Sequence, residues 1–554
     1  MARYSDFASP DEAVLIETDD FALVYDRRNR AFHKKRWDSS TKSWTTKVAP
    51  YSAIVCKDGS TVWAEDASGK TIASGESGVD DASVIQSAIN NDVVILRGDF
   101  SLDKTIEITN SGSTVFLQGS IESSANPIFY IHGSFEGWNY VGKVRVQGLG
   151  RNVHIKGNYN NDAIFIEAAT QIHIENLRVH DCKRGVVING LWGSQSEIKE
   201  ITFYSMKPGA NEALLHILKP PADTSTDIIF EDIGFDVRED ADPSSWAVRI
   251  DDANARFMHF KDIDAEAVYN GVYIQGHNIH ITRAKPRCDR GGVGLVLKGH
   301  SHIVENLYET KGILLDGADR CTIAHCRNIY AEKNGNYCVD IKDSTYNNLI
   351  DINTAPDAQA IAGFKLEGET YWNILRDCRC VQLRGKYAIH FAPNARLNKI
   401  IHPHIRRLNY KDDYPASECF IVYNEYFDYT FANRIFNPHN WDNIDHVSGF
   451  INDVRGCYIK GSKAEFKTEK SGTATFSGDG STTDFEIGAH DLFTTDPSKI
   501  AVKVTPISSD AIAASPCVGY VDPADNTKIR VKFSSAPASG SGNVKIVWYA
   551  EVIS

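Results

Sequence analysis

Three stretches of the chain share one pattern and decide the fold: Gly312-Ile-Leu-Leu-Asp316, Cys338-Val-Asp-Ile-Lys342 and Gly363-Phe-Lys-Leu-Glu367. Each is a small residue followed by alternating apolar and variable residues, and the stretches start 25 or 26 residues apart. Alternation with period two predicts a β-strand, and a fixed longer period predicts stacked repeats. Further copies of the pattern start at 163, 185, 247, 271, 294 and 388, with looser ones at Leu214 and Cys419. The chain is therefore predicted to form a parallel β-helix.

A second repeated position in the sequence, occupied by asparagine, has the same period. Asn348, Asn373 and Asn398 each stand before an apolar strand, and they are 25 residues apart. A repeated asparagine beside a repeated strand supports one coil per repeat.

The 554 residues include regions on both sides of the repeat. We expect an N-terminal β-region over 1–75, the β-helix over 76–445 with a capping helix at 80–90, and a C-terminal β-sandwich over 446–554. The helix has an apolar stripe that would cover the open first coil, which otherwise exposes an unpaired edge. The last region is rich in Ser, Thr and Gly and contains short alternating strands, as a sandwich does.

Composition excludes several classes of protein. The formal charge of −13 disfavours nucleic-acid binding. No apolar run approaches the roughly 20 residues that span a bilayer, so no membrane insertion is expected. The N-terminus has no secretory pattern, and the eleven cysteines have no paired spacing. We therefore expect reduced thiols, synthesis in a cytoplasm, no metal site and no cofactor.

The segment Asp80-Asp-Ala-Ser-Val-Ile-Gln-Ser-Ala-Ile89, followed by an aliphatic strand and Gly98-Asp-Phe100, carries a resemblance. It is similar to the start of the pectate-lyase-like right-handed parallel β-helix superfamily, in the version found in viral tailspikes and tail fibres. The resemblance implies a virion protein, made in the host cytoplasm, that adsorbs to a cell-surface polysaccharide. It also implies a homotrimer whose N-terminal region contacts other tail proteins.

The repeat lets side chains that point outward be aligned from coil to coil. Among others, the third position of the pattern gives Arg249, Tyr273, Val296, Asp340, Lys365, His390 and Ile421, and the fifth gives Asp251, Asp316, Lys342 and Glu367. Asp316 and Glu367 are two coils apart, which separates their backbones by roughly 9 to 10 Å. An inverting glycosidase needs its carboxylates roughly 6.5 to 9.5 Å apart. Asp316, Asp340 and Glu367 are thus candidate catalytic residues, and the candidate sugar-binding residues are Arg249, Asp251, Tyr273, Lys342, Lys365 and His390.

Other interpretations of this face stay open. Asp316, Lys342 and Glu367 alternate in charge, as a purely structural ladder would. A structural or adhesive spike without catalysis fits that pattern. A cellular polysaccharide hydrolase or lyase of the pectinase type also shares the fold, because the fold alone does not set the function. Among enzymes, a glycoside hydrolase fits the acids better than a lyase, which would need a base beside cations or calcium.

Overall fold

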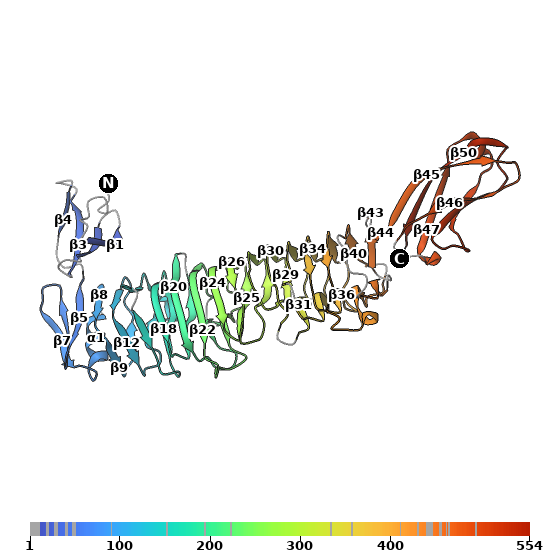
Figure 1. Cartoon of the computed structure of the whole chain (residues 1–554). Helices are drawn as coiled ribbons and strands as arrows, with labels where there is room; N and C mark the ends of the chain where they lie inside the picture. The colour runs from blue at the N-terminus through green and yellow to red at the C-terminus, as the bar shows by residue number, and fades with distance from the viewer. Residues whose placement is uncertain are drawn as a thin grey trace. The chain divides into compact units, whose positions relative to one another are not determined.

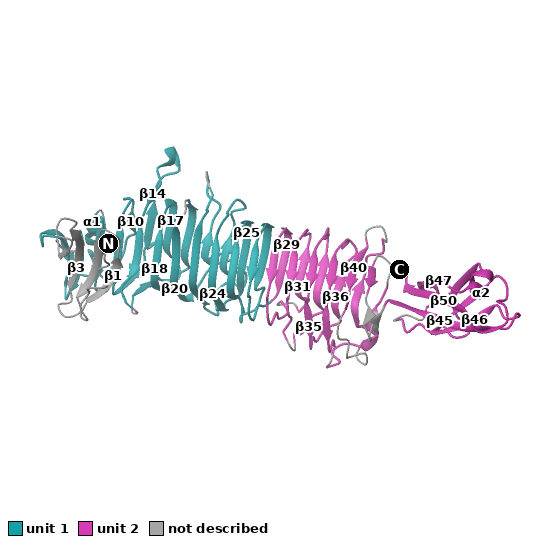
Figure 2. Ribbon diagram, turned by 90° about the horizontal axis from the view of Figure 1, so that it is seen from above, with its two compact units in different colours: residues 1–311 teal, residues 312–554 magenta. Residues whose placement is uncertain are grey.

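The computed structural model describes residues 51–553 except 90, 151–152, 193–194, 222–223, 333–334, 356–357, 410, 429–431, 439–446, 454–456, 461, 464–465 and 493–495. Of the first fifty residues it describes four strands, β1 (Glu12–Glu17), β2 (Phe21–Asp26), β3 (Ala31–Asp38) and β4 (Ser43–Thr46), which form an antiparallel sheet in that order. The chain divides into two compact units, residues 1–311 and 312–554 (Figure 2).

From β17 onward, consecutive strands of unit 1 alternate between two parallel sheets, so that each coil adds one strand to each sheet (Figure 1). One sheet contains β10 (Ile106–Ile108), β13 (Phe129–His132), β17 (Asp162–Thr170), β19 (Arg184–Leu191), β21 (Ala213–Ile217), β23 (Trp246–Ile250), β25 (Asn270–His277) and β27 (Leu295–His300). The other contains β8 (Val93–Arg97), β11 (Thr114–Gln118), β15 (Arg145–Gly148), β18 (His173–His180), β20 (Ser196–Met206), β22 (Ile228–Val237), β24 (His259–Ala267), β26 (His280–Lys285) and β28 (Ile303–Glu305). Short strands β9 (Phe100–Leu102), β12 (Ser120–Ser123) and β16 (His154–Lys156) extend it. The predicted parallel β-helix is confirmed.

The apolar positions of the repeat form the interior of the solenoid. Ile164 and Ile166 of β17 are both 0% exposed. Like residues stack from coil to coil, as in the rings of Phe230 and Phe260, whose centroids are 4.5 Å apart. Each fully buried aliphatic or aromatic side chain contributes roughly 1.5 to 3 kcal/mol. Because every coil repeats this burial, the strand pattern alone is sufficient to specify the stack.

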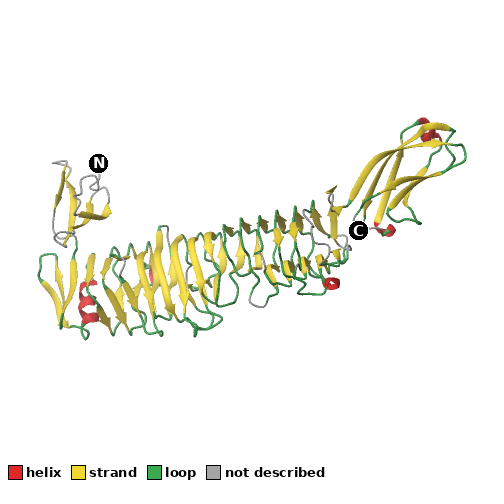
Figure 3. Ribbon diagram, viewed as in Figure 1, coloured by secondary structure: helices red, strands yellow, loops and turns green. Residues whose placement is uncertain are grey.

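The first coil is covered by β5 (Ala53–Asp58), β6 (Thr61–Asp66), β7 (Thr71–Glu76) and α1 (Asp81–Ile89), the long helix of Figure 3. The predicted capping helix is therefore present. Its Val84, Ile85 and Ile89 are buried. The fully buried Asp81 accepts hydrogen bonds from the backbone N–H groups of Gly78 (2.8 Å) and Ser101 (2.7 Å) and from the Lys57 ammonium. These bonds fix the helix to the first coil.

Unit 2 continues the same alternation. One parallel sheet contains β29 (Ile313–Asp319), β31 (Tyr337–Lys342), β33 (Ala362–Glu367), β36 (Tyr387–Phe391), β39 (Phe420–Asn424) and β41 (Gly449–Ile451). The second contains β30 (Thr322–Ala324), β32 (Asn348–Ile350), β34 (Ile374–Arg376), β37 (Lys399–Ile401), β40 (Asn433–Phe436) and β42 (Cys457–Lys460), and β35 (Arg379–Val381) pairs with β38 (His404–Arg406). These strands again form stacked coils.

The C-terminal part of unit 2 holds two antiparallel three-stranded sheets. They are β45 (Glu469–Gly478), β50 (Gly540–Val552) and β47 (Ile500–Pro506), and β46 (Asp484–Ala489), β49 (Lys528–Phe533) and β48 (Cys517–Val521). Phe533, Val544 and Ile546 pack with the short helix α2 (Ser509–Ala513) in their common core. Two sheets around one apolar core make a β-sandwich.

A buried asparagine ladder runs through the coils of unit 2. The backbone N–H groups of Asn347, Asn373 and Asn398 each donate to the side-chain oxygen of the next asparagine, which is Asn433 at the end, at 3.0 to 3.1 Å. The sequence repeat aligned Asn348 with Asn373 and Asn398, but Asn347 has the corresponding place in this ladder. Asn348 is exposed on β32, and its neighbour Asn347 occupies the corner at 1% exposure.

Two further details differ from the sequence analysis. Tyr423, not Ile421, pairs with His390, so the Cys419 copy is displaced by two residues. Val296 and Ile421, expected on the outer face, are only 4% and 6% exposed. The eleven cysteines are free thiols, and all but Cys56 and Cys517 are buried. In the part of the chain that the structure describes, no helix could span a membrane.

Candidate functional site

The candidate residues of unit 2 lie on one face of the sheet that contains β29, β31, β33 and β36. Asp340 pairs with Leu314 on one side and with Lys365 on the other, and Lys365 pairs with His390. Two residues further along the strands, Lys342 pairs with both Asp316 and Glu367. The structure thus places these six polar residues in two neighbouring columns: Asp340, Lys365 and His390, and Asp316, Lys342 and Glu367.

Asp340 is not on the surface as the repeat alone would suggest. It is only 2% exposed, and its Oδ1 atom has no hydrogen-bond partner. Its Oδ2 atom lies 3.9 Å from Lys365 Nζ. A buried polar atom without a partner costs roughly 1 to 3 kcal/mol. Such an atom in a folded protein calls for an explanation beyond packing.

Lys365 and Glu367 cover Asp340. They form an ion pair with each other, and their side chains are 22% and 28% exposed. Burial raises the pKa of Asp340 to about 7; the Lys365 charge opposes this rise, and the charge and hydrogen bond of Glu367 add to it. The site therefore places a buried carboxyl group that titrates near neutral pH beside the ion pair of Glu367 with Lys365.

Tyr337, at the start of β31, belongs to the same cluster. Burial and the charges of Asp340, Glu332, Glu367 and Asp316 all raise the pKa of its phenol. Tyr337 therefore stays protonated and neutral among four acids. The sequence analysis missed it because it stands one residue before the repeated pattern.

His390 and Lys342 lie at the borders of this cluster. His390 Nε2 is 3.0 Å from Glu425 Oε2, and its ring contacts Tyr423 edge-on at 5.4 Å. Lys342 is exposed on β31. The predicted sugar-binding residues of unit 2 therefore surround the acids, with Asp316 half-buried beside Lys342.

The predicted residues of unit 1 form a separate cluster on β21, β23 and β25. Arg249 Nε donates to Asp251 Oδ1 at 2.8 Å, and its guanidinium lies 4.8 Å from the centre of the Tyr273 ring. Asp251 Oδ2 is 2.8 Å from Nε2 of His216, which is 4% exposed and whose Nδ1 has no partner. Burial raises the pKa of Asp251, but His216 and Arg249 outweigh it and the net shift is downward. His216 was not among the predicted site residues.

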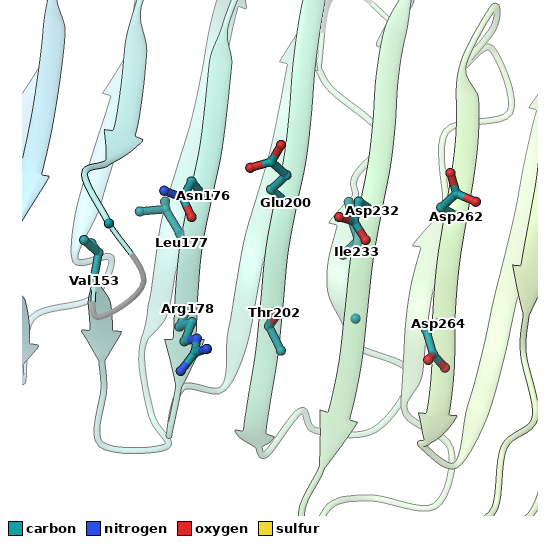
Figure 4. A pocket seen from close by; sticks show the side chains of 12 residues that line it. Val153, Asn176, Leu177, Arg178, Glu200, Thr202, Asp232, Ile233, Asp262 and Asp264 are labelled. Carbon is teal, nitrogen blue, oxygen red and sulfur yellow. The ribbon is translucent and has the colours of Figure 1, made fainter. Parts of the chain in front are cut away.

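Two hollows of the described surface lie in unit 1. One, of about 390 Å³, lies over the second sheet, where Glu200, Asp232, Asp262 and Asp264 line it together with Arg178 (Figure 4). Glu200, Asp232 and Asp262 have φ angles of 54°, 55° and 55° and mark the same bend in successive strands. No group of three potential ligands among the described residues could hold a metal ion.

The second hollow, of about 570 Å³, is lined by Lys219, Pro220, Pro221, Thr224, Asp252, Asn254, Arg256 and His277. None of its residues was predicted as a site residue, because all but His277, the last residue of β25, stand in the loops between repeated strands. The repeat pattern carries no signal for such positions.

The chain was also compared with known proteins. No family model and no curated protein matches it. Similar solved structures include the tailspike protein of E. coli bacteriophage HK620 in complex with a pentasaccharide. The sequence identity to it is 10% and the TM-score is 0.43, and the match covers 88% of this chain and 92% of that chain. A mutant of that tailspike in complex with a hexasaccharide has 11% identity and a TM-score of 0.41, over 87% of this chain and 91% of that chain.

Proposed function

We propose that this chain is a viral tail spike that adsorbs to a host cell-surface glycan and hydrolyses it on the outer face of unit 2. The observation that carries the proposal is the buried carboxyl of Asp340, with an unpartnered oxygen and a raised pKa, beside the ion pair of Glu367 with Lys365. Shifted pKa values of this kind concentrate at functional sites, where they supply acids and bases near neutral pH. The viral assignment is supported by the similarity of residues 80–100 to tailspike β-helices.

The geometry divides the roles among the three acids. Glu367 is the base, because it forms an ion pair with Lys365 and its side chain is partly exposed. Asp316, two coils away in the same column, is the acid, at the roughly 9 to 10 Å backbone separation of two strands. That spacing leaves room for the water of an inverting hydrolysis. Asp340 is too buried to touch a sugar, so it is a positioning residue that holds Glu367.

The test is incubation of the purified protein with surface polysaccharides extracted from candidate host cells. New reducing ends without unsaturated products are expected, and Glu367→Gln and Asp316→Asn should each abolish them. Glu369→Gln is the matched control, because its exposed carboxylate pairs with Arg396 outside the cluster. Unsaturated products would contradict hydrolysis and identify a lyase.

A spike that only adheres is the second candidate. The ion pair of Lys365 with Glu367 and the alternation of Asp316, Lys342 and Glu367 favour it, since both would stabilise the coils without chemistry. In that case the glycan is bound without cleavage, and Glu367→Gln leaves its affinity unchanged.

The proposal includes assembly into a homotrimer, with the N-terminal region contacting other virion proteins. Because Val296 and Ile421 are already buried within one chain, the surface between chains must involve other residues. Light scattering that gives the mass of a monomer at micromolar concentration would contradict the trimer.

A further inference from the structure

A loop of unit 1 carries a row of aromatic side chains into solvent. Residues 133–140 connect β13 to β14 (Val141–Gly142), and the loop stands out beside β14 (Figure 2). The ring centroids of Trp138 and Tyr140 are 6.0 Å apart, and those of Tyr140 and Trp192 are 6.4 Å apart. Trp138 is 67% exposed and Trp192 is 47% exposed. Indole rings this exposed in an ordered segment indicate a recognition surface.

Backbone hydrogen bonds hold this row in place. The N–H of Ser134 donates to the carbonyl oxygen of Asn139 at 2.8 Å and closes the loop. The N–H of Trp192 donates to the carbonyl oxygen of Ala169 at 2.8 Å. The aromatic surface is therefore formed before any ligand arrives, which lowers the entropy cost of binding.

The 570 Å³ hollow is next to this row. Phe135 packs over Gly190, where a Cβ would lie 2.8 Å from the Phe135 ring and 3.4 Å from Pro220 Cβ. Pro220 lines the hollow together with Lys219 and Arg256. The aromatic row thus leads to two cationic side chains.

The hollow is a built feature. Asp252, 1% exposed, accepts hydrogen bonds from Thr224 Oγ1 (2.6 Å), the Ser225 N–H (3.2 Å) and the Asn254 N–H (2.9 Å). It thereby joins the two loops that carry Lys219 and Arg256. Since Asp252 is buried and saturated with donors, the exposed Lys219 and Arg256 dominate the charge at the opening.

We propose that this surface binds an acidic polysaccharide: sugar rings stack on Trp138 and Trp192, and an anionic substituent enters the hollow to meet Arg256 and Lys219. The inference rests on the proposed glycan adsorption and adds the class of glycan. A guanidinium forms paired, charge-assisted hydrogen bonds with carboxylate or phosphate groups, and the apolar faces of sugars fit aromatic rings.

The experiment is binding of the full-length protein to a glycan array that presents neutral, uronic-acid, sialic-acid and phosphate-bearing bacterial oligosaccharides. We expect binding to acidic glycans only. Binding to the glycans with uronic or sialic acid would identify the anionic group as a carboxylate, and binding to the phosphate-bearing glycans would identify it as a phosphate. Arg256→Gln and the pair Trp138→Ala with Trp192→Ala should each weaken it about tenfold or more. The controls are Tyr204→Ala, another exposed ring at 60% exposure, and Arg283→Gln, another exposed cation.

The outcomes separate this inference from the proposed function. Binding confined to neutral glycans, or unchanged by the variants, overturns the inference and leaves glycan adsorption standing. Binding to no glycan overturns both. A fall in molecular mass on replacing Trp138 and Trp192 would show that a second copy occupies the surface, and would also overturn the inference.

Discussion

Replacing Asp340 by asparagine should stabilise the protein above neutral pH. Burial raises the pKa of Asp340 from 3.8 to about 7. Each unit of that rise corresponds to about 1.4 kcal/mol, so the ionised side chain costs the folded state about 4 kcal/mol. Asparagine has nearly the same shape and no charge. It can donate a hydrogen bond to Glu367, as the protonated acid does.

The sign of the pH dependence follows from the direction of the pKa shift. Because the pKa is higher in the folded state, its contribution to stability is fully present below pH 3.8 and is lost as pH rises through about 7. At pH 5 the folded carboxyl keeps its proton, and at pH 8 it has lost it. The stability of Asp340→Asn relative to the parent should therefore grow by about 2 to 3 kcal/mol between pH 5 and pH 8.

The assay is denaturant unfolding of both proteins at pH 5 and pH 8, with infrared difference spectra to follow the protonated carboxyl group directly. Asp377→Asn is the control, because its carboxylate is 50% exposed, and a change within about 0.5 kcal/mol is expected there. The reasoning is refuted if Asp340→Asn is less stable than the parent at pH 8. It is also refuted if the parent has no carboxyl band that titrates near neutral pH, or if Asp340→Asn keeps such a band.

Three further changes test other parts of the structure. Asn373→Ala should lower the free energy of unfolding by about 3 kcal/mol or more, because it leaves buried groups of the asparagine ladder without partners. Unfolding midpoints measure this loss. As the control, Asn348→Ala should change the midpoint little, since Asn348 is exposed on β32. Lys365→Met should destabilise the protein by roughly 1 to 3 kcal/mol at pH 8, since it leaves two acids uncompensated; equal stability of variant and parent would contradict this. The ring of His259 stacks on that of His280 at 4.6 Å, and burial, then the charge of His280, lowers the pKa of His259. Stability from this group is present above pH 6.5 and is lost as pH falls, so the hydrogen-exchange protection factors of β24 should fall at pH 5.5. His259→Gln should reduce that fall, and an unchanged fall would count against the pairing.

Most of the fold followed from local pattern. Strands have a side-chain period of two, and coils stack in register, so Asp340, Lys365 and His390 could be placed in one column from the sequence alone. The register failed at Ile421, where the long connection after Phe391 changes the alignment by two residues. A repeat predicts positions only while each coil adds the same number of residues.

The candidate site was less predictable, because burial depends on neighbours that the pattern does not specify. Asp340 occupies an outward position, yet it is covered by Lys365 and Glu367 of the next coil. Tyr337 and the Glu332 segment add to its surroundings from outside the repeated strand. The cationic hollow around Arg256 is lined mostly by loop residues, and the repeat of the strands does not align loop positions from coil to coil.

The magnitudes decide between a structural ladder and a functional cluster on this face. Alternating charges across neighbouring strands contribute roughly 0.2 to 1 kcal/mol per pair. The partly exposed column of Asp316, Lys342 and Glu367 already provides that alternation. Burying Asp340 costs about 4 kcal/mol in its ionised form, which the contact with Lys365 does not offset, because the pKa remains raised. A ladder alone would be more stable with asparagine at this position, so the retained carboxyl is better explained by the chemistry of Glu367 than by the stability of the coil.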